Sequence, residues 1–341
     1  MELAAESLVE FPSSWYPLCR STDVRPGKVV RQEAFGMPLA IFRTPSLKVG
    51  ALYARCTHMG ADLGRGRVVR ERLQCPLHHW EYGREGRCEH IPGSCVIPRQ
   101  VHQAALVCEE HYGLVFGFLG GEPTFPFPRF AGEEPGLYSR VSVMSFVTPY
   151  QVLAANSFDS QHFVTVHHRR LLEPPTLASE SAFHLSIRFR AQVEGSQFHD
   201  RLLRRIGVDQ VELSAHCWGG NTILAYNTRT GARILFTILP IDARRSRIFI
   251  LNVMGQETAA AFPRALRRLL LSAMHGLTVA FLKPDIAVMQ DLQWKLGVLL
   301  PDLDGCFLEW IRYWKALPTS PLTVRGSRCA REHPQENYPL E

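Results

Sequence analysis

Two short stretches decide the fold of this chain: CTHMGADLG, which begins at Cys56, and QCPLHHW, which begins at Gln74. Each brings one cysteine and one histidine together, as Cys56-x-His58 and Cys75-x-x-His78. Two thiolates on one iron and two imidazoles on the other can hold a [2Fe-2S] cluster, and the imidazoles raise its potential above that of an all-cysteine cluster. We therefore expect these four side chains to hold a [2Fe-2S] cluster.

Zinc is the other metal that these ligands suit, because Cys₂His₂ is also a zinc ligand set. The order of the residues favours the cluster, since both loops place the cysteine before the histidine. Tight turns and an aromatic cover are expected at Gly60, Gly64, Pro76, Trp80, Tyr82, Gly83 and Gly86. His79 follows His78 directly, and the C-x-x-H spacing favours His78 as the ligand, with His79 facing outward.

The two loops resemble those of the Rieske domain family, in which they form the tip of a small antiparallel β domain. Rieske subunits of respiratory complexes carry one further cysteine in each loop, and these two form a disulfide beside the cluster. Here those places hold Ala61 and Leu77, so the resemblance is to the ferredoxin or oxygenase branch. A Rieske ferredoxin is complete at roughly a hundred residues, near the modal domain size, whereas this chain has 341. A large second domain is therefore expected.

A second metal motif follows in that region, within NSFDSQHFVTVH, which begins at Asn156. Two histidines and a distant carboxylate are the ligands of mononuclear non-haem Fe(II), which keeps positions open for dioxygen. The pattern D-x-x-H-x-x-x-x-H of Asp159, His162 and His167 resembles the catalytic-domain motif of the Rieske non-haem iron oxygenases. Asp159 and His162 would share one helical face, but His162 and His167 would not, so a π-like turn or a helix break is expected. The family spacing favours His167 over His168.

The third iron ligand is expected far downstream in the chain. Asp285, in FLKPDIAVMQD, stands where the family carries its carboxylate, after a long apolar helix and before a hydrophobic pair. An aspartate directly after a proline is also a favourable helix N-cap, and Asp291 is the alternative ligand. We predict that His162, His167 and Asp285 hold the Fe(II).

The family resemblance implies a mechanism and an assembly. In Rieske oxygenases the cluster accepts single electrons and passes them to the Fe(II), which activates O₂ beside a bound organic substrate. The two metals of one subunit are too far apart for fast transfer. A homotrimer solves this by placing the cluster of one subunit against the iron of the next.

Asp159 matches the residue that bridges the two metals in the family, where it would hydrogen-bond His78 of one chain and His162 of the next. A carboxylate between two metal-bound imidazoles fixes their tautomers and tunes their basicity. Without that role Asp159 would be an ordinary acid on a helix surface. Asn156, one helical turn earlier, would serve either the iron site or a structural hydrogen bond.

The source of electrons is expected outside this chain. No G-x-G-x-x-G opens a βαβ unit, and there is no second ferredoxin-type cysteine set. We expect a separate reductase, with or without an intermediate ferredoxin, so that NAD(P)H acts only through that reductase. The net charge of +6 suits an acidic donor protein, because complementary charge speeds encounter.

The expected activity is that of a Rieske non-haem iron mono- or dioxygenase acting on a small hydrophobic substrate, aromatic or heterocyclic. The front half of the chain and the iron motif resemble the aminopyrrolnitrin-oxygenase group, which oxidises an arylamine to a nitro compound. Similarity in cluster loops tracks electron transfer, so hydroxylation, demethylation and oxidative cyclisation stay open beside N-oxygenation. Apolar residues near the motif are candidates for either pocket or core: Phe158, Phe163, Leu224, Phe236 and Met289.

A non-enzymatic alternative is a large Rieske electron-transfer protein whose second domain only docks partners. In that case Asp285 would be dispensable, and the iron content would stop at the cluster.

The fold class follows from composition and periodicity. A hydrophobic content of 46% with 21% charged residues is ordinary for a globular protein with a substantial core. Alternation in VVRQEAFGMPLAIFR, LKVGALYAR and VHQAALVCEEHYGLVFGFLG predicts strands, and an all-β cluster domain over residues 13–121. The run EPTFPFPRF predicts a linker over 122–139. Strands such as RILFTILPI and SRIFILNVMG, mixed with helices, predict an α+β catalytic domain over 140–317. The polar end, 318–341, is expected to be a mobile tail.

Helical segments are expected near residues 153–168 and 262–297. The most apolar stretch, LRRLLLSAMHGLTVAFL, is interrupted by arginine and histidine. It therefore predicts a core helix rather than a membrane span.

Charge and cysteine content bear on partners and location. No block of five or six basic residues suggests nucleic-acid binding, and the arginines of RLLRR (Arg201, Arg204 and Arg205) are expected on a solvated helix face. No basic region followed by an apolar run opens the chain, so a cytoplasmic protein without a membrane anchor is expected. Nine cysteines, an odd number, fit a reducing compartment. Cys88 and Cys95 are expected as free buried thiols.

Overall fold

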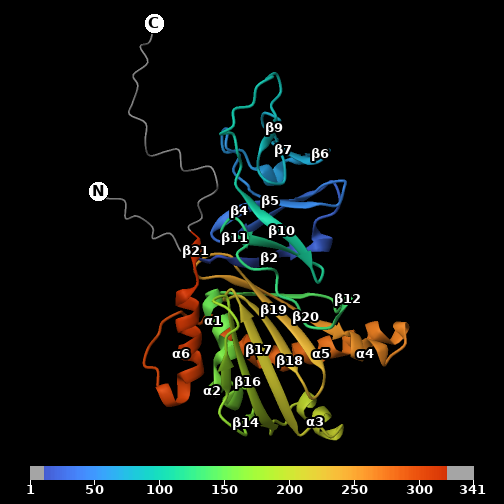
Figure 1. Cartoon of the computed structure of the whole chain (residues 1–341), viewed down its shortest axis with the longest axis vertical. Coiled ribbons are helices and arrows are strands. Elements are labelled where there is room, and N and C mark those ends of the chain that lie inside the picture. Colours follow the sequence, from blue (N-terminus) through green and yellow to red (C-terminus); the bar gives the residue numbers. More distant parts are fainter. Residues whose placement is uncertain (1–10, 321–341) are drawn as a thin grey trace.

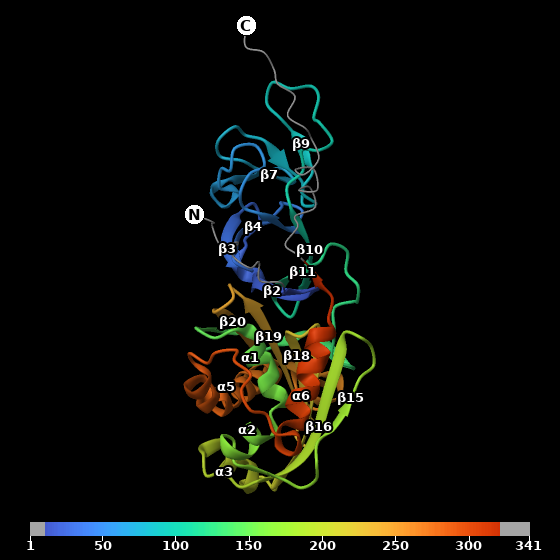
Figure 2. The ribbon, with the colours of Figure 1, turned by 90° about the vertical axis from the view of Figure 1, so that its left-hand side faces the viewer.

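The computed structural model describes residues 11–320. Two parts stack along the long axis of the molecule: a β domain at one end, and a large sheet flanked by helices at the other (Figures 1 and 2). The two ends of the described chain meet, because β1 (Phe11–Pro12) pairs with β21 (Thr319–Ser320). This pairing ties the start of the first part to the end of the second.

The first part consists of two antiparallel sheets, as the alternating patterns predict. The larger has the strand order β2-β11-β10-β5-β4-β3, and the smaller has the order β6-β7-β8-β9. Their bounds are β2 (Ser14–Arg20), β3 (Val29–Ala34), β4 (Met37–Arg43), β5 (Val49–Tyr53), β6 (Arg67–Val69), β7 (Arg72–Gln74), β8 (Glu81–Tyr82), β9 (Cys88–His90), β10 (Ala105–His111) and β11 (Leu114–Leu119), with short 3₁₀ helices η1 (Ser21–Asp23) and η2 (Leu63–Arg65). One cluster loop follows β5 and the other joins β7 to β8.

The second part is built on a sheet of nine strands with the central order β12-β20-β19-β18-β17-β16-β14. The bounds are β12 (Glu133–Tyr138), β13 (Ser142–Phe146), β14 (Arg169–Leu171), β15 (Thr176–Ala178), β16 (His184–Val193), β17 (Gln210–Trp218), β18 (Thr222–Asn227), β19 (Ala232–Pro240) and β20 (Ser246–Gly255). In β16 the apolar side chains Ile187 and Phe189 are buried while Arg188 and Arg190 are exposed, which is the period of a sheet with two different faces.

Helices cover one face of this sheet and lie along its edge (Figure 2). They are α1 (Tyr150–Ala155), η3 (Asn156–Phe158), α2 (Ser160–Thr165), α3 (Phe198–Arg205), α4 (Gln256–Ala260), α5 (Arg264–Met289) and α6 (Pro301–Ala316). α6 begins with Pro301 and carries Asp302 and Asp304 in its first turn, residues that suit the N-terminus of a helix. The predicted α+β class is confirmed.

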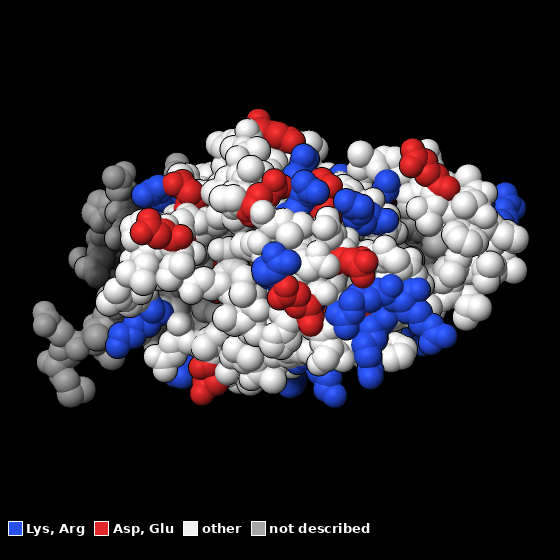
Figure 3. All heavy atoms as spheres, turned by 90° about the horizontal axis from the view of Figure 1, so that it is seen from below, with Lys and Arg blue, Asp and Glu red and all other residues white. Residues whose placement is uncertain are grey.

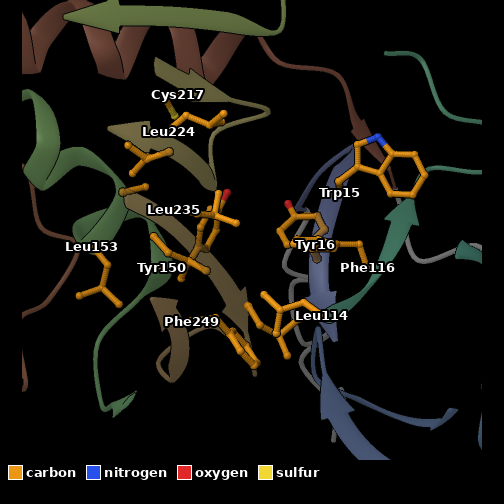
Figure 4. Packing of buried hydrophobic residues seen from close by; sticks show 14 of the residues in the cluster. Trp15, Tyr16, Leu114, Phe116, Tyr150, Leu153, Cys217, Leu224, Leu235 and Phe249 are labelled. Atoms are coloured by element: carbon orange, nitrogen blue, oxygen red, sulfur yellow. The ribbon is translucent and has the colours of Figure 1, made fainter. Parts of the chain in front are cut away.

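One hydrophobic core joins the two parts. Figure 4 shows Trp15 and Phe116, on strands of the cluster domain, across from Tyr150 and Leu235 of the second part. Asn221 adds buried polar contacts at this junction, since its side chain accepts a hydrogen bond from Ser14 Oγ at 2.7 Å and donates one to the Trp15 carbonyl at 2.8 Å. The cluster domain is therefore fixed on the sheet that carries the second site.

The segment predicted as a linker, 122–139, is more ordered than expected. Phe125, Phe127 and Phe130 are buried in the shared core, and β12 lies inside this segment and pairs with β20. β12 does not show the sequence pattern of a strand. Its register against β20 shifts within the strand, and Gly136, at φ +72°, interrupts the alternation of apolar and polar residues. Of the predicted tail, 318–341, Thr319 and Ser320 form β21, and the rest lies outside the described residues.

The helix predicted over 262–297 is shorter than expected, because α5 ends at Met289 and residues 290–300 are not helical. α5 is long and apolar enough to cross a membrane by length and composition alone, a test that core helices also pass. It is packed by one face, on which Leu271, His275 and Thr278 are buried. The predicted core helix is therefore a one-sided helix packed against β20 and α3.

Charged side chains of both signs are interspersed on the lower face of the molecule seen in Figure 3, with one gathering of basic side chains. In α3, Arg201 and Arg205 are exposed, as predicted, but Arg204 donates hydrogen bonds to the carbonyls of Val193 and Gly195. The eight cysteines of the described residues are all free. Cys88 is buried as expected, whereas Cys95 is exposed, which contradicts its prediction as a buried thiol.

Candidate cluster loops and mononuclear metal centre

The two cluster loops meet at the end of the molecule farthest from the large sheet (Figure 1). Cys56 and Cys75 are buried at the base of the loops, whereas His58 and His78 are exposed. The rings of His58 and His78 lie 4.7 Å apart between centroids, and His58 stacks on Trp80 at 4.2 Å. This places two sulfur donors inside and two nitrogen donors at the tip, as a [2Fe-2S] cluster with mixed ligands requires.

Tight turns set this geometry. The Gly60 N–H donates to the Cys56 carbonyl at 2.8 Å while Gly60 holds φ +72°, a conformation that favours glycine. The Cys75 N–H donates to the Trp80 carbonyl, and His79 takes φ +56° at this bend. It is the ring of His78 that lies beside His58, which favours His78 over His79 as the ligand.

The surroundings of Cys56 also fit a cluster. Burial raises the pKa of the Cys56 thiol, and the nearby Cys75 thiol adds to that effect, while hydrogen bonds from Tyr82 and from the His58 backbone oppose it. The Tyr82 hydroxyl lies 3.1 Å from the sulfur, where it can donate a hydrogen bond to a thiolate. Among the described residues, Cys56, His58, Cys75 and His78 do not form a set of mutually close donors of the kind that binds a single ion. That spacing argues against the zinc alternative.

The mononuclear site lies in the second part, where three donors from two distant segments converge. Nε2 of His162 and Nε2 of His167 lie 2.9 and 3.0 Å from Oδ1 of Asp285, and the two nitrogens are 3.2 Å apart. The three residues His162, His167 and Asp285 are 7, 5 and 7% exposed, respectively. Asp291 lies beyond the end of α5, is exposed, and takes φ +64°. The structure therefore brings Asp285 to the histidines and leaves Asp291 away from them.

Two local features position these ligands. α2 ends at Thr165, so the predicted helix break falls between His162 and His167. Asp285 lies inside α5, which excludes its alternative role as a helix N-cap. A helix interior holds its side chain in place, because the backbone on both sides is hydrogen-bonded.

The arrangement fits a metal ion. Asp285 Oδ1 is buried and accepts no well-aligned hydrogen bond, although two imidazole nitrogens lie close to it. The three donor atoms lie within 4.8 Å of one another, and two histidines with one carboxylate are the facial ligand set of non-haem Fe(II). Burial opposes the ionised form of Asp285, but the neighbouring His162 and His167 outweigh it and lower the pKa of the carboxyl. The ionised carboxylate is the form that binds a metal.

A buried ion pair between Arg169 and Asp200 contacts the backbone of His167. The guanidinium of Arg169 donates to the His167 carbonyl at 2.8 Å and to Oδ1 of Asp200 at 2.6 Å. Phe281 of α5 stacks on the His167 ring at 4.1 Å, and the Arg169 guanidinium lies 5.5 Å from the Phe281 ring centroid. These contacts were not predicted, because two arginines after a histidine pair carry no pattern that distinguishes a buried side chain from an exposed one. They fix both the backbone and the ring of a candidate ligand.

Asp159 and Asn156 lie beside His162. Oδ1 of Asp159 accepts a hydrogen bond from the His162 backbone N–H at 3.0 Å, so Asp159 is the N-cap of α2 rather than a residue within it. This corrects the expectation that the two share a helical face. Nδ2 of Asn156 lies 3.3 Å from Nε2 of His162, which places Asn156 at the metal site.

A second set of close donors occurs at Glu180, His184 and His216, on the other face of the sheet. Here hydrogen bonds already use the ring nitrogens: the Glu180 N–H donates to Nδ1 of His184, and Nε2 of His184 lies 3.0 Å from Nδ1 of His216. Burial lowers the pKa of both histidines, so they are neutral near pH 7. A neutral His184 then carries its proton on Nε2 and donates it to His216, which is a structural hydrogen-bond chain.

A cavity of about 150 Å³ lies against the mononuclear site and is bordered by His167 and Asp285. Of the predicted pocket residues, Phe163, Phe236 and Met289 line it. Phe158 and Leu224 are instead fully buried core residues. Strand alternation explains why Leu224 does not line the cavity, because its neighbours Ile223 and Ala225 face the cavity and Leu224 points to the other side of the sheet.

Comparisons with known proteins agree with the division of the chain into a cluster domain and a second domain. Residues 14–109 match the Rieske [2Fe-2S] domain family. The chain is 32% identical over 176 residues to aminopyrrolnitrin oxygenase PrnD of Pseudomonas fluorescens, covering 48% of each chain. It is 30% identical over 165 residues to the oxygenase component of 3-ketosteroid-9-alpha-monooxygenase of Rhodococcus rhodochrous, covering 46% of this chain and 44% of the relative. The matched segments thus span about half the length of these curated relatives.

Solved structures extend the likeness to the whole fold. Dicamba monooxygenase bound to dicamba superposes with a TM-score of 0.69 at 16% identity, covering 91% of this chain and 98% of that one. NdmA of Pseudomonas putida CBB5 with caffeine gives a TM-score of 0.60 at 19% identity, covering 88% of both. The class is therefore defined: the chain consists of a Rieske [2Fe-2S] domain followed by a second, helix-covered sheet domain. Its first domain is a Rieske [2Fe-2S] domain, and the chain as a whole has the fold of dicamba monooxygenase and NdmA.

Proposed function

We propose that this protein is an O₂-dependent mono- or dioxygenase that oxidises a small hydrophobic substrate, aromatic or heterocyclic, by hydroxylation, N-oxygenation, demethylation or oxidative cyclisation. One observation carries the proposal: His162, His167 and Asp285 converge at the wall of an apolar cavity. A protein that only carried electrons would have no use for a buried ligand set beside a cavity that can hold an organic molecule.

The residues that would hold the two metal groups are distinct. Cys56, His58, Cys75 and His78 would hold the [2Fe-2S] cluster, and His162, His167 and Asp285 would hold the Fe(II). When bound, these groups supply electron transfer and dioxygen activation. The apolar lining of the cavity excludes water from the reaction, and Phe281 and Arg169 hold His167 in place.

The assembly that fits this function is a homotrimer. The cluster loops and the mononuclear site lie at opposite ends of one chain (Figure 1), so a second copy is needed to bring them together. A groove beside Asp159 and His162 is bordered by the exposed apolar residues Val288 and Leu296. The cluster loops carry exposed apolar residues of their own, Met59 and Leu77. Burial of these surfaces against each other would place His78 of one copy beside Asp159 of the next.

The electron donor is a separate reductase, with or without a ferredoxin, and NAD(P)H acts only through it. Beside the cluster loops lies an open groove bordered by Arg31, Arg55 and Arg65 and by one acid, Asp62, which pairs with Arg31 at 3.0 Å, so that the groove is basic on balance. Such a basic groove suits an acidic donor, because charge complementarity speeds encounter and is screened by salt. The rate at limiting donor concentration should therefore fall as salt is added, and an unchanged rate would contradict this docking.

The proposed activity is tested by a substrate screen with a surrogate reductase, scored by O₂ uptake. Uptake that depends on an organic compound and yields an oxidised product stoichiometric with it supports the oxygenase. Reduction of the cluster with electrons passed on to an added acceptor, and with no compound-dependent O₂ uptake, would identify an electron carrier instead.

A further inference from the structure

The cavity beside the mononuclear site limits the size of its occupant. Its volume is about 150 Å³. An engineered protein cavity of about that volume, lined by aliphatic and aromatic side chains, holds one benzene molecule. The cavity is thus matched to a single ring with a small substituent rather than to several fused rings.

One wall of the cavity is the large sheet, and it presents apolar side chains. Ala215 pairs with Ala225, which pairs with Ile234, and directly paired residues share a face. Phe236 pairs with Ile250 on the same face. All five border the cavity, and none of their side chains can form a hydrogen bond.

Ser214 also borders the cavity, but strand alternation turns its side chain to the other face of the sheet. There it pairs with Tyr226, one position on from the Ala215–Ala225 pair. Its hydroxyl therefore does not add a polar group to the sheet wall.

The polar side chains of the cavity gather on the opposite, helical wall. Asn156 and Ser157 lie on η3, next to the candidate ligands His167 and Asp285. Asn156 is also within 3.3 Å of Nε2 of His162. Among the described residues that border the cavity, the polar side chains that can bind a ligand therefore lie at its metal end.

We propose that the substrate is an uncharged molecule of about one ring, with its polar group towards Asn156 and Ser157 and its apolar remainder against the sheet. This assignment rests on the proposed function, since it names the occupant of the same cavity. An ionised group against the sheet would lose its hydration without gaining a partner, which is strongly unfavourable. A four-ring compound, such as the ketosteroid named for one relative, would exceed the cavity.

Ala225 and Phe236 set the size limit from the sheet side. Ala225 is the middle residue of the row Ala215–Ala225–Ile234, so leucine at this position adds three carbon atoms directly into the cavity. Phe236 lies in the neighbouring row, and its replacement by alanine removes a ring from the wall. Tyr226 follows Ala225 on the same strand and faces the other way, which makes it a matched control.

The test is calorimetric binding to the iron-loaded full chain under anaerobic conditions, with benzyl alcohol, benzoate and progesterone as probes. Benzyl alcohol is expected to bind at one site, benzoate at least about 30-fold more weakly because of its charge, and progesterone not at all. Ala225→Leu should abolish binding of benzyl alcohol, whereas Tyr226→Phe should leave it unchanged. Phe236→Ala should admit 2-naphthalenemethanol, which the unmodified protein rejects. Unchanged cluster absorbance and thermal unfolding show that each variant is folded.

Three results would overturn the assignment: no binding of benzyl alcohol, binding of benzoate or progesterone at least as tight, or binding that survives Ala225→Leu in the folded variant. Because binding is scored without turnover, it is independent of the proposed activity. Binding as expected without compound-dependent O₂ uptake leaves the substrate class standing and refutes the oxygenase. Oxidation of a steroid or a carboxylate coupled to O₂ uptake would support the oxygenase and refute the proposed substrate class.

Discussion

The two candidate metal sites of this chain differ in how they face solvent. The histidines of the cluster loops are exposed at the tip of the molecule, while every candidate ligand of the mononuclear site is buried. Exposure suits a centre that exchanges electrons with other proteins, because electron transfer requires close approach of the partner. Burial suits a centre that activates oxygen, because an enclosed site keeps water from side reactions. The difference in exposure fits the proposed function, in which electrons enter at one site and the oxidation takes place at the other.

The largest effect is expected at the cluster loops. His78→Ala removes a ligand and should abolish the visible absorption of the cluster, since no other imidazole lies beside His58 in the described loops. His79→Ala changes the adjacent residue and should retain the cluster. Absorption and electron paramagnetic resonance spectra of both variants measure this. If His79→Ala loses the cluster and His78→Ala keeps it, the ligand assignment is wrong.

The second largest effect is expected from a substitution of Asp159, the residue proposed to connect the two metal sites. Asp159→Asn should retain both metals yet lower turnover by at least about 100-fold, because an amide cannot hold two imidazoles as a carboxylate does. Asparagine is as good an N-cap as aspartate, so the capping bond to His162 is preserved and thermal stability should not change.

Asp159→Ala serves as the comparison, because it removes the cap as well and should lower the free energy of unfolding by about 1 kcal/mol. Turnover of Asp159→Asn close to that of the unmodified protein would refute the bridging role and leave Asp159 as a helix cap.

The buried ion pair behind His167 gives a moderate effect on both stability and metal binding. Arg169→Ala leaves Asp200 buried without its main partner, which should cost about 3–5 kcal/mol of unfolding free energy and weaken iron binding by about 10–100-fold. Arg170→Ala is the matched control, because Arg170 pairs with Glu194 on the surface and such pairs contribute about 0–1 kcal/mol. Equal iron affinity in the two variants would show that Arg169 has no role in positioning His167.

These expectations also show what the sequence could predict. The cluster ligands lie within one short stretch, so their order and spacing, together with the resemblance of the two loops to the Rieske family, predicted a Rieske centre, and the family match confirms that domain. Asp285 is separated from His162 by more than a hundred residues, and only the resemblance to a family indicated it. Its position inside α5, rather than at a cap, depends on how α5 packs on the sheet. No local pattern carries that information.

The cavity was the least predictable part. Phe163 and Phe236 line it while Phe158 and Leu224 do not, and the four are equally apolar. Which face of a strand is turned to a cavity depends on the register between strands, and register follows from tertiary packing. Arg169 likewise gave no signal, since its partner Asp200 lies 31 residues away along the chain and no local pattern links the two.

The smallest effect concerns a buried histidine away from both sites. Ring nitrogens of His275 lie 2.8 Å from Ser142 Oγ and 3.2 Å from Asn252 Oδ1, and burial together with Arg140 lowers its pKa below the usual value. The unfolded chain therefore binds a proton near pH 6.5 before the folded protein does. Stability should be constant above that pH and fall below it, by at most about 1.4 kcal/mol per pH unit for this residue.

Chemical unfolding between pH 7.5 and 5.5 checks this dependence. His275→Gln should give a shallower loss of stability over that range than the unmodified protein. An identical dependence on pH in both proteins would show that His275 does not contribute to it.

The most direct test of the two-site account is iron analysis of the purified protein together with its Asp285→Ala and Asp291→Ala variants. The account predicts mononuclear iron in addition to cluster iron in the unmodified protein and in Asp291→Ala, and cluster iron alone in Asp285→Ala, with the same cluster spectrum in all three. Cluster iron alone in the unmodified protein after loading with Fe(II), or mononuclear iron retained in Asp285→Ala, would contradict it.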